Sequence, residues 1–352
     1  MKINHSLSFI AAGVTISILL GACGAENPAK ASIDEKKNGT VGLAADFSGI
    51  DDKSFNQSAW EGLKAWGQKN HLSKGLQGYD YIQAESASDY VMNLQTLANN
   101  KFDTVVAMGF KLTEALIEVA PQYPATNFAI VDVAMPKMDN VASLVFKDNE
   151  SAFLAGVAAA ESTLSNKIGF IGGQESDIID KFEAGFVQGV KTVKPEVEVR
   201  VEYVGSFADS AKGKAIAAAM YASGIDIIFQ AAGDSGNGVF AEAKDVMNSN
   251  SNDKKWVIGA DRDQTAEGDY SSGNVTLTST LKQTGSAIQD IADRASKGDF
   301  PGGEILNYGL VEDGVGLTDG QLTKETIKKV DLFKRQISTG ELVVAEKPEN
   351  KN

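Results

Sequence analysis

The chain has 352 residues, which is enough for two domains of ordinary size, each with its own core. Hydrophobic residues make up 43% of it and charged residues 23%, and with 35 glycines this composition is typical of a globular α/β protein and excludes disorder, collagen and coiled coils. The 47 acidic and 33 basic side chains give a formal net charge of −14, which argues against a nucleic-acid partner because phosphate backbones are repelled. With one cysteine and two histidines, we expect no disulfide framework, no metal site and no cofactor.

Residues 1–22 are interpreted as a lipoprotein signal peptide. Lys2 is followed by a 14-residue apolar run at 7–20, which is too short to span a bilayer. The run ends in Leu20-Gly21-Ala22-Cys23, which resembles a bacterial lipobox, so we expect Cys23 to carry the lipid that anchors the chain to the extracytoplasmic side of the cell membrane. A cleaved signal with a coincidental cysteine is the alternative. Residues 23–39 lack apolar periodicity and are expected to form a flexible tether.

From residue 40 short apolar runs alternate with amphipathic segments. The predicted strands are 40–45, 80–84, 104–108, 127–131, 141–146, 167–171, 197–204, 225–230, 255–259 and 275–281. The predicted helices are 54–68, 89–99, 112–123, 150–164, 178–192, 210–222 and 237–247. In the first helix Phe55, Leu63 and Trp66 share one face. The alternation predicts an α/β fold with parallel sheets covered by helices on both faces, and the number of units predicts two such lobes.

Three predicted strands lead into an aspartate. These residues are Asp46 after strand 40–45, Asp132 after 127–131 and, one residue beyond 255–259, Asp261. Open parallel sheets bind ligands outside the carboxyl ends of their strands, so the three carboxylates fall where a ligand is expected. A helix cap or turn residue is the alternative for any one of them. An ionised carboxylate accepts hydrogen bonds from two donors, which suits neighbouring hydroxyls of a sugar ring.

Two other turns follow strands. The segment 233–238, which begins with Gly233 and Asp234, precedes a helix, and we interpret it either as a tight turn that lets the backbone approach a small ligand, with Asp234 as a further acceptor, or as a plain loop. It matches neither a phosphate loop, nor the dinucleotide fingerprint, nor a nucleophile elbow, which would require glycine in place of Asn237. The turn that ends at Phe110 is expected to add an aromatic wall.

The sequence lacks the histidines that common catalytic sites require, which argues against an enzyme. His71 is the one histidine beyond the predicted signal peptide, and we expect it to be a solvated surface residue. A serine triad or a zinc site would need an imidazole that is not available. A glycosidase-like pair of carboxylates is not excluded by counting residues, but no spacing singles out such a pair. We therefore predict that the protein is not an enzyme.

Long ordered motifs resemble those of the basic-membrane-protein family, the lipid-anchored purine-nucleoside receptors of bacterial ABC importers. The opening motif is Asp46-Phe47-Ser48-Gly49-Ile50-Asp51-Asp52-Lys53-Ser54-Phe55-Asn56-Gln57, followed by Ala59-Trp60-Glu61-Gly62. The likeness continues through Phe182-Glu183-Ala184-Gly185-Phe186, Phe207-Ala208-Asp209, Ile228-Phe229-Gln230-Ala231-Ala232-Gly233, residues 256–264 and Phe300-Pro301-Gly302-Gly303. It covers nearly all of the chain between residues 40 and 344.

The resemblance implies a type I periplasmic-binding-protein fold, in which two doubly wound parallel-sheet lobes are joined by a three-strand hinge. The implied first lobe is 40–146 plus 282–303, the second is 147–281 plus 304–345, and a C-terminal tail follows at 346–352. The implied function is capture of a purine nucleoside of the adenosine, guanosine and inosine class in the cleft between the lobes. Its partner would be the permease of an ABC transporter, reached when the lobes close by a hinge.

The resemblance also implies where the ligand lies. Asp46, Asn56 and Asp132 would line the cleft from the first lobe, Asp261 and Lys282 would meet the ribose, and Phe55 and Phe207 would sandwich the base. Without the family, Lys282 would be read as a surface lysine and Phe55 as a core aromatic. Phe207 lies outside any apolar run and is the more suggestive ring.

Four functions remain open at this point. They are a receptor for purine nucleosides, a receptor of the same fold for another small polar ligand such as a sugar or a signalling molecule, a nucleoside-processing enzyme, and a surface adhesin. Because several carboxylates face one lysine, the first of these predicts that nucleosides bind in preference to nucleotides.

Overall fold

The computed structural model describes residues 39–250 and 252–349. The predicted signal peptide, the predicted lipidation site Cys23 and the predicted tether up to residue 38 lie outside the described residues, as do the last three residues of the predicted tail. The statements below concern the described residues.

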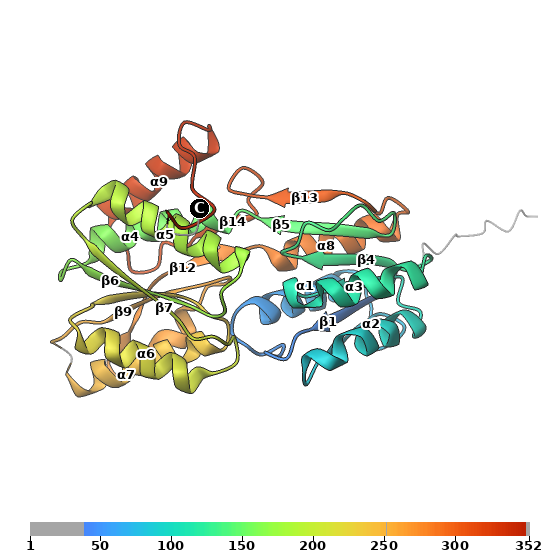
Figure 1. Cartoon of the computed structure of the whole chain (residues 1–352), viewed down its shortest axis with the longest axis horizontal. Helices are drawn as coiled ribbons and strands as arrows, with labels where there is room; N and C mark the ends of the chain where they lie inside the picture. The colour runs from blue at the N-terminus through green and yellow to red at the C-terminus, as the bar shows by residue number, and fades with distance from the viewer. Residues whose placement is uncertain (1–38, 251, 350–352) are drawn as a thin grey trace, which may run out of the picture. The chain divides into compact units, whose positions relative to one another are not determined.

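The first lobe is built on a six-stranded, fully parallel sheet with the strand order β13-β5-β4-β3-β1-β2 (Figure 1). Its strands are β1 (Val41–Ala45), β2 (Tyr79–Gln83), β3 (Thr104–Ala107), β4 (Asn127–Val131), β5 (Val141–Phe146) and β13 (Ile305–Tyr308). Helices α1 (Phe55–Lys69) and α8 (Thr284–Ser296) pack in the core on one face, and α2 (Tyr90–Asn99) and α3 (Thr113–Val119) pack in the core on the other.

The second lobe repeats this plan with the strand order β14-β12-β9-β8-β6-β7. Its strands are β6 (Lys167–Gly172), β7 (Glu198–Tyr203), β8 (Ile227–Ala231), β9 (Trp256–Gly259), β12 (Thr276–Lys282) and β14 (Val315–Leu317). Figure 1 shows α6 (Ser210–Ala222) and α7 (Ser235–Ser249) below this sheet, with α4 (Asp148–Ser162) and α5 (Asp177–Val193) above it. Helix α9 (Lys324–Ser338) packs against α4.

Short elements complete the described chain. The pair β10 (Asp269–Tyr270) and β11 (Gly273–Asn274) forms a small antiparallel hairpin. The 3₁₀ turns are η1 (Ala87–Asp89), η2 (Phe110–Leu112), η3 (Ala120–Gln122) and η4 (Thr265–Gly268).

Three connections join the lobes, as predicted. They are Lys147 between β5 and α4, Gln283 between β12 and α8, and residues 309–314 between β13 and β14. Each lies next to a strand end that faces the other lobe. The two-lobed, doubly wound architecture expected from the alternation of strands and helices is therefore confirmed.

Three details differ from the expectations. The implied first lobe resumes at residue 282, but Lys282 is the last residue of β12 and belongs to the second sheet. The implied boundaries place residues 305–308 in the second lobe, but β13 pairs with β5, with Ile305 opposite Ser143, so this strand belongs to the first sheet. The reason is that the chain crosses to the second lobe only after Tyr308, so residues 305–308 pair with the otherwise free edge of β5. The second sheet is also not fully parallel, because β14 returns antiparallel to β12, with Val315 opposite Lys282.

Candidate functional site

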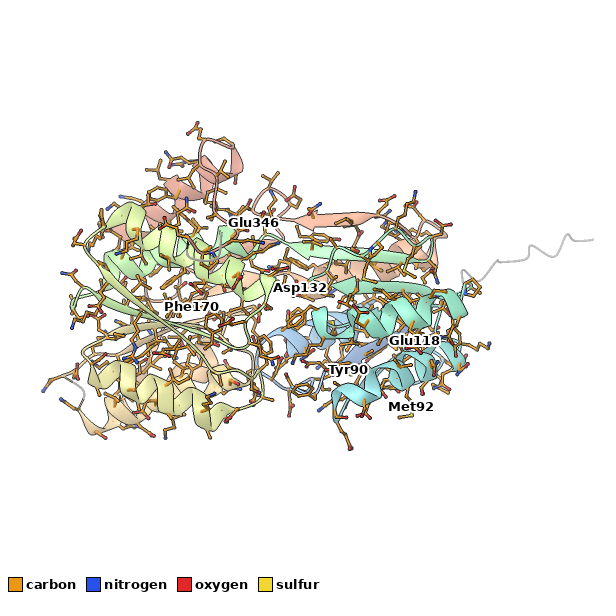
Figure 2. All side chains as sticks on the ribbon, in the orientation of Figure 1. Tyr90, Met92, Glu118, Asp132, Phe170 and Glu346 are labelled. Atoms are coloured by element: carbon orange, nitrogen blue, oxygen red, sulfur yellow. The ribbon has the colours of Figure 1, made fainter. Side chains whose placement is uncertain are left out.

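A cavity lies between the lobes at the carboxyl ends of both sheets. About 640 Å³ of space outside protein atoms lies in this region, part of it open to solvent. Its walls are formed by Asp46, Ser48, Asp52, Phe55, Asn56, Met108, Gly109, Phe110, Lys111, Asp132, Ile178, Ile179, Phe182, Phe207, Ala231, Gly233, Ala260, Asp261 and Lys282. Nine of the ten predicted ligand residues are among them, and Figure 2 shows Asp132 in the region where the lobes adjoin. The structure thus brings together residues that are up to 236 positions apart, as Asp46 and Lys282 are.

One end of the cavity is a buried cluster of charges around Lys282. The Nζ atom of Lys282, the last residue of β12, lies 2.7 Å from Asp132 Oδ1 and 3.1 Å from Asp148 Oδ2. A third carboxylate, that of Asp261, accepts a hydrogen bond of 2.5 Å from Ser54 Oγ. Three carboxylates therefore share one ammonium group in a region where solvent screens little.

Burial sets the protonation of this cluster. It raises the pKa of Asp132 to about 6, against the opposing attraction of Lys282. It raises the pKa of Asp261 to about 6 for the same reason, although Lys282 and the Ser54 hydrogen bond both favour the ionised form. Burial alone would lower the pKa of Lys282, but the attraction of the three carboxylates outweighs it and raises that pKa. The lysine is therefore charged, and the two aspartates titrate within reach of neutral pH.

Asp132 and Asp261 also share an unusual backbone. Their φ angles are 71° and 69°, in the left-handed region that L-residues other than asparagine and aspartate rarely adopt. Each residue ends a corresponding segment of its lobe, after β4 and after β9. Such conformations are found at turns and at binding sites, and here the same one occurs at two of the three carboxylates around Lys282.

The other end of the cavity is a second polar group around Asp46. Asp46 Oδ1 accepts a 3.0 Å hydrogen bond from Asn56 Nδ2, and its Oδ2 accepts one of the same length from Lys111 Nζ. Asn56 is 1% exposed, and its Oδ1 has no hydrogen-bond partner among the described residues. A buried acceptor of this kind costs free energy unless a donor meets it. This end therefore presents an unused acceptor together with a carboxylate and an ammonium group.

Aromatic rings from both lobes also line the cavity. Phe55, at the start of α1, has its ring centroid 5.1 Å from Lys282 Nζ. Phe207 comes from the second lobe, packs against Gly173, and meets Phe110 edge-on at 6.4 Å between centroids. The walls of the cavity thus combine aromatic rings with two groups of charged and polar side chains, and each group has a ring beside it: Phe55 beside Lys282 and Phe207 beside Lys111. That Phe55 and Phe207 sandwich a base stays a prediction.

The structure adds residues that sequence patterns did not single out. Asp52 caps the start of α1, where its carboxylate accepts hydrogen bonds from the backbone N–H groups of Ser54, Asn56 and Gln57 at 2.9 to 3.0 Å. Burial raises the pKa of Asp52 to about 6 even so. The signal available in the sequence was an aspartate just before a helix start, which is a weak one.

Asp234 is the predicted residue that lies off the wall of the cavity. It precedes α7, and its Oδ1 accepts a 2.9 Å hydrogen bond from Asn237 Nδ2. Its neighbour Gly233 does line the cavity, with a φ of 57° and with Phe207 packed beside it, which agrees with the interpretation of segment 233–238 as a tight turn.

Comparison with known proteins places this geometry in context. Residues 40–347 match the family described as ABC transporter substrate-binding protein PnrA-like. The chain is 45% identical over 340 residues to the ABC transporter nucleoside-binding protein BmpA of Lactococcus lactis, covering 95% of this chain and 96% of that protein. It is 46% identical over 344 residues to the CD4+ T-cell-stimulating antigen of Listeria monocytogenes, with the same coverage. It is 32% identical over 308 residues to basic membrane protein A of Borreliella burgdorferi, covering 86% of each.

Among solved structures, an ABC transporter solute-binding protein of Aeropyrum pernix superposes with a TM-score of 0.77 at 24% identity, covering 88% of this chain and 94% of that one. A transcriptional activator of the comK gene from Bacillus halodurans superposes with a TM-score of 0.69 at 23% identity, covering 86% and 99%. At such identities the likeness concerns the fold alone. The predicted periplasmic-binding-protein fold is confirmed.

Proposed function

The chain belongs to the family of PnrA-like ABC transporter substrate-binding proteins, and from this premise we propose that it captures purine nucleosides between its lobes and delivers them to the permease of an ABC importer. The family membership confirms the resemblance seen in the sequence motifs. The family and the Lactococcus lactis relative are described as binding proteins, which fits the prediction that the chain is not an enzyme.

The observation that carries the ligand proposal is that ring surfaces and buried carboxylates line the same cavity. A purine nucleoside is a flat heterocycle with polar edges joined to a ring of hydroxyls. Phe55, Phe110 and Phe207 offer ring surfaces for the heterocycle, and aromatic stacking on a base is worth about 1 to 3 kcal/mol. The carboxylates of Asp132 and Asp261 offer acceptors for the hydroxyls, next to the ammonium group of Lys282.

The same charges argue against nucleotides. Asp132, Asp148 and Asp261 oppose one lysine at one end of the cavity, and at the other end Lys111 is already paired with Asp46. A phosphate group would therefore enter without a free cation in the described walls. Burying such a charge without a partner is costly.

A ligand panel tests the proposal. By isothermal titration calorimetry we expect adenosine, guanosine and inosine to bind, and their monophosphates, free bases and ribose to bind at least about tenfold more weakly, a difference of about 1.4 kcal/mol. Equal affinity for adenosine and its monophosphate would defeat the preference for nucleosides. Tight binding of ribose or another sugar alone would favour the receptor for a different polar ligand.

Replacing Phe207 with alanine is expected to weaken nucleoside binding by about tenfold to 100-fold, because a stacking surface is lost. The matched control is Phe333→Ala, since Phe333 is also a partly buried ring of the second lobe but packs on Phe153 at 5.4 Å, away from the cavity wall. Calorimetry should give an unchanged dissociation constant for the control. A Phe207→Ala variant that binds as tightly as the unaltered protein would remove this ring from the site.

Attachment to the membrane is part of the same proposal. The lipobox-like sequence at Leu20-Gly21-Ala22-Cys23 supports a lipid anchor at Cys23 on the extracytoplasmic side, where an importer's receptor meets its substrate. Among the described residues, every helix is too short or too polar to cross a membrane. The anchor would leave the two lobes free to meet the permease.

A further inference from the structure

Three consecutive residues of the first lobe form direct hydrogen bonds to the second lobe. The carbonyl oxygen of Asp52 accepts a 3.3 Å hydrogen bond from Asn237 Nδ2, and that of Lys53 accepts one of 2.8 Å from Gln264 Nε2. The hydroxyl of Ser54 donates to Asp261 Oδ2. We call residues 52–54 the bridging segment. It leads directly into α1, whose first two residues line the cavity.

Gln264 holds this segment with a fixed orientation. Its side chain is fully buried, and its Oε1 accepts hydrogen bonds from Gln230 Nε2 at 2.7 Å and from the backbone N–H of Ala260 at 2.9 Å. Both groups that face Oε1 are donors, so this atom has to be the oxygen of the side-chain amide. The nitrogen Nε2 of Gln264 is therefore the atom that faces the Lys53 carbonyl. Its own backbone N–H is fixed as well, by Ser279 Oγ at 3.1 Å. The second lobe thus presents a preorganised donor to one carbonyl of the first lobe.

The backbone of Lys53, whose carbonyl accepts this hydrogen bond, has an energetically unfavourable conformation. Lys53 has a φ of 62°, in the left-handed region, so the bridging segment needs outside support to keep its shape. Immediately after it, Phe55 and Asn56 begin α1, and Asn56 donates to Asp46. A shift at Lys53 would therefore move an aromatic wall and a polar group of the cavity together.

From this geometry we infer that Gln264 is a positioning residue for ligand capture. It acts through the Lys53 carbonyl, holds the bridging segment against the second lobe, and so stabilises the arrangement in which Phe55 and Asn56 complete the cavity. The inference rests on the proposed function for its ligand, but the contact itself is independent of which ligand binds. Loss of the contact lowers the population of the binding-competent arrangement, which weakens apparent affinity and shortens the bound lifetime.

The test compares Gln264→Glu and Gln264→Met with the control Gln230→Met. Gln264→Glu keeps an acceptor for Ala260 and Gln230 but turns a carboxylate oxygen toward the Lys53 carbonyl, and Gln264→Met removes donor and acceptor together. Gln230 is equally buried in the same network, yet its side-chain hydrogen bonds stay within the second lobe, to Gln264 and to the backbone of Ala232. All three variants lose buried hydrogen bonds, and only the first two lose the bond to the other lobe.

The measurements are the inosine dissociation rate by stopped flow and the hydrogen exchange of residues 50–58 by mass spectrometry, with and without inosine. Both Gln264 variants are expected to dissociate about tenfold faster and to exchange faster at residues 50–58, as expected for one lost hydrogen bond in a buried setting. Gln230→Met is expected to lower the melting temperature. It should change neither the inosine dissociation rate nor the exchange rate of residues 50–58 by more than about twofold.

The outcomes separate this inference from the proposed function. If the unaltered protein binds inosine and a folded Gln264→Met variant keeps both the dissociation rate and the exchange pattern, Gln264 has no positioning role. If Gln230→Met reproduces the Gln264 effects in full, the cause is general loss of packing and the inference is overturned. If the unaltered protein binds no nucleoside, the proposed function fails, and the exchange of residues 50–58 without ligand still decides whether Gln264 holds the bridging segment.

Discussion

Replacing Lys282 with methionine is expected to weaken nucleoside binding by about 100-fold or more, because truncating one partner of a buried charge pair leaves the other partner uncompensated. The Nζ atom of Lys282 lies within 3.1 Å of both Asp132 and Asp148, and the Lys282 side chain is 2% exposed. Without this ammonium group, the carboxylates would repel one another and take up protons. They would then no longer be available as acceptors for the ribose hydroxyls.

Lys255→Met is the matched control for this prediction. Lys255 is also a buried lysine of the second lobe, with a side chain 5% exposed and an ion pair of 2.8 Å to Asp253, but it lies outside the cavity wall. Calorimetric titration with inosine should show a near-normal dissociation constant for the control and little or no heat for Lys282→Met. A Lys282→Met protein that is folded and binds inosine within about threefold of normal would refute the role of this charge cluster.

Most strands of the two sheets were predictable because they are short, buried apolar runs, while β2 and β7 are half-buried along most of their length. All ten predicted strands occur within one or two residues of their predicted positions, from β1 to β12. The elements of the last 70 residues were harder. In α9 only Thr326, Val330 and Ile337 are buried, which is a narrow stripe on a charged helix. The strand β13 is partly exposed along its length, and its partner β5 lies about 160 residues earlier, so its pairing depends on where the chain crosses between lobes.

The candidate site was predictable as far as it follows from sheet geometry. Asp46, Asp132 and Asp261 were found because ligands bind at the carboxyl ends of parallel strands, and the cavity lies there. The sequence did not identify Asp148 or Gln264 as site residues. The role of each depends on a contact with a residue more than 100 positions away in the sequence. Contacts between residues so far apart in the sequence leave no periodic trace in either segment, so composition and spacing carry no signal for them.

Lys111 is another site residue that the sequence patterns did not identify. In sequence it is a polar residue two positions after Gly109, and it looks like an ordinary solvated lysine. In the structure its Nζ lies 3.0 Å from Asp46 Oδ2 and 4.8 Å from the ring centroid of Phe207 in the other lobe. Asp234, by contrast, had the right position after a strand, but its carboxylate binds the amide of Asn237 instead of facing the cavity. Position after a strand therefore identifies candidates, and the turn that follows decides which way they face.

Acidification is expected to weaken nucleoside binding, while the buried aspartates of the cavity contribute more to the stability of the unliganded protein. Burial raises the pKa values of Asp132, Asp261 and Asp52 to about 6, above the ordinary value of 3.8. Between those two values the folded state binds more protons than the unfolded state. The contribution of these groups to the free energy of unfolding is therefore fully favourable below about pH 3.8 and is lost as the pH rises through about 6.

Binding has the opposite dependence on pH. Ribose hydroxyls that donate to Asp132 and Asp261 favour the ionised carboxylates, so binding should release protons near pH 6. The groups that face this pair are Lys282, which stays charged, together with Asp148, Asp52 and the Ser54 hydroxyl. We expect inosine affinity to be level near pH 7.5 and to fall by about tenfold per pH unit below about pH 6 for each proton that must be released.

Calorimetry in buffers of different ionisation enthalpy measures the protons released, and thermal unfolding of the unliganded protein measures its stability. The Asp261→Asn variant removes one titrating acceptor, so it should bind more weakly at neutral pH but show a flatter pH profile. Affinity that stays constant from about pH 7.5 to about pH 5, with no proton release, would mean that the ligand does not bind the ionised form of these carboxylates. In that case the ribose would have to contact other groups of the cavity, such as the polar group around Asp46.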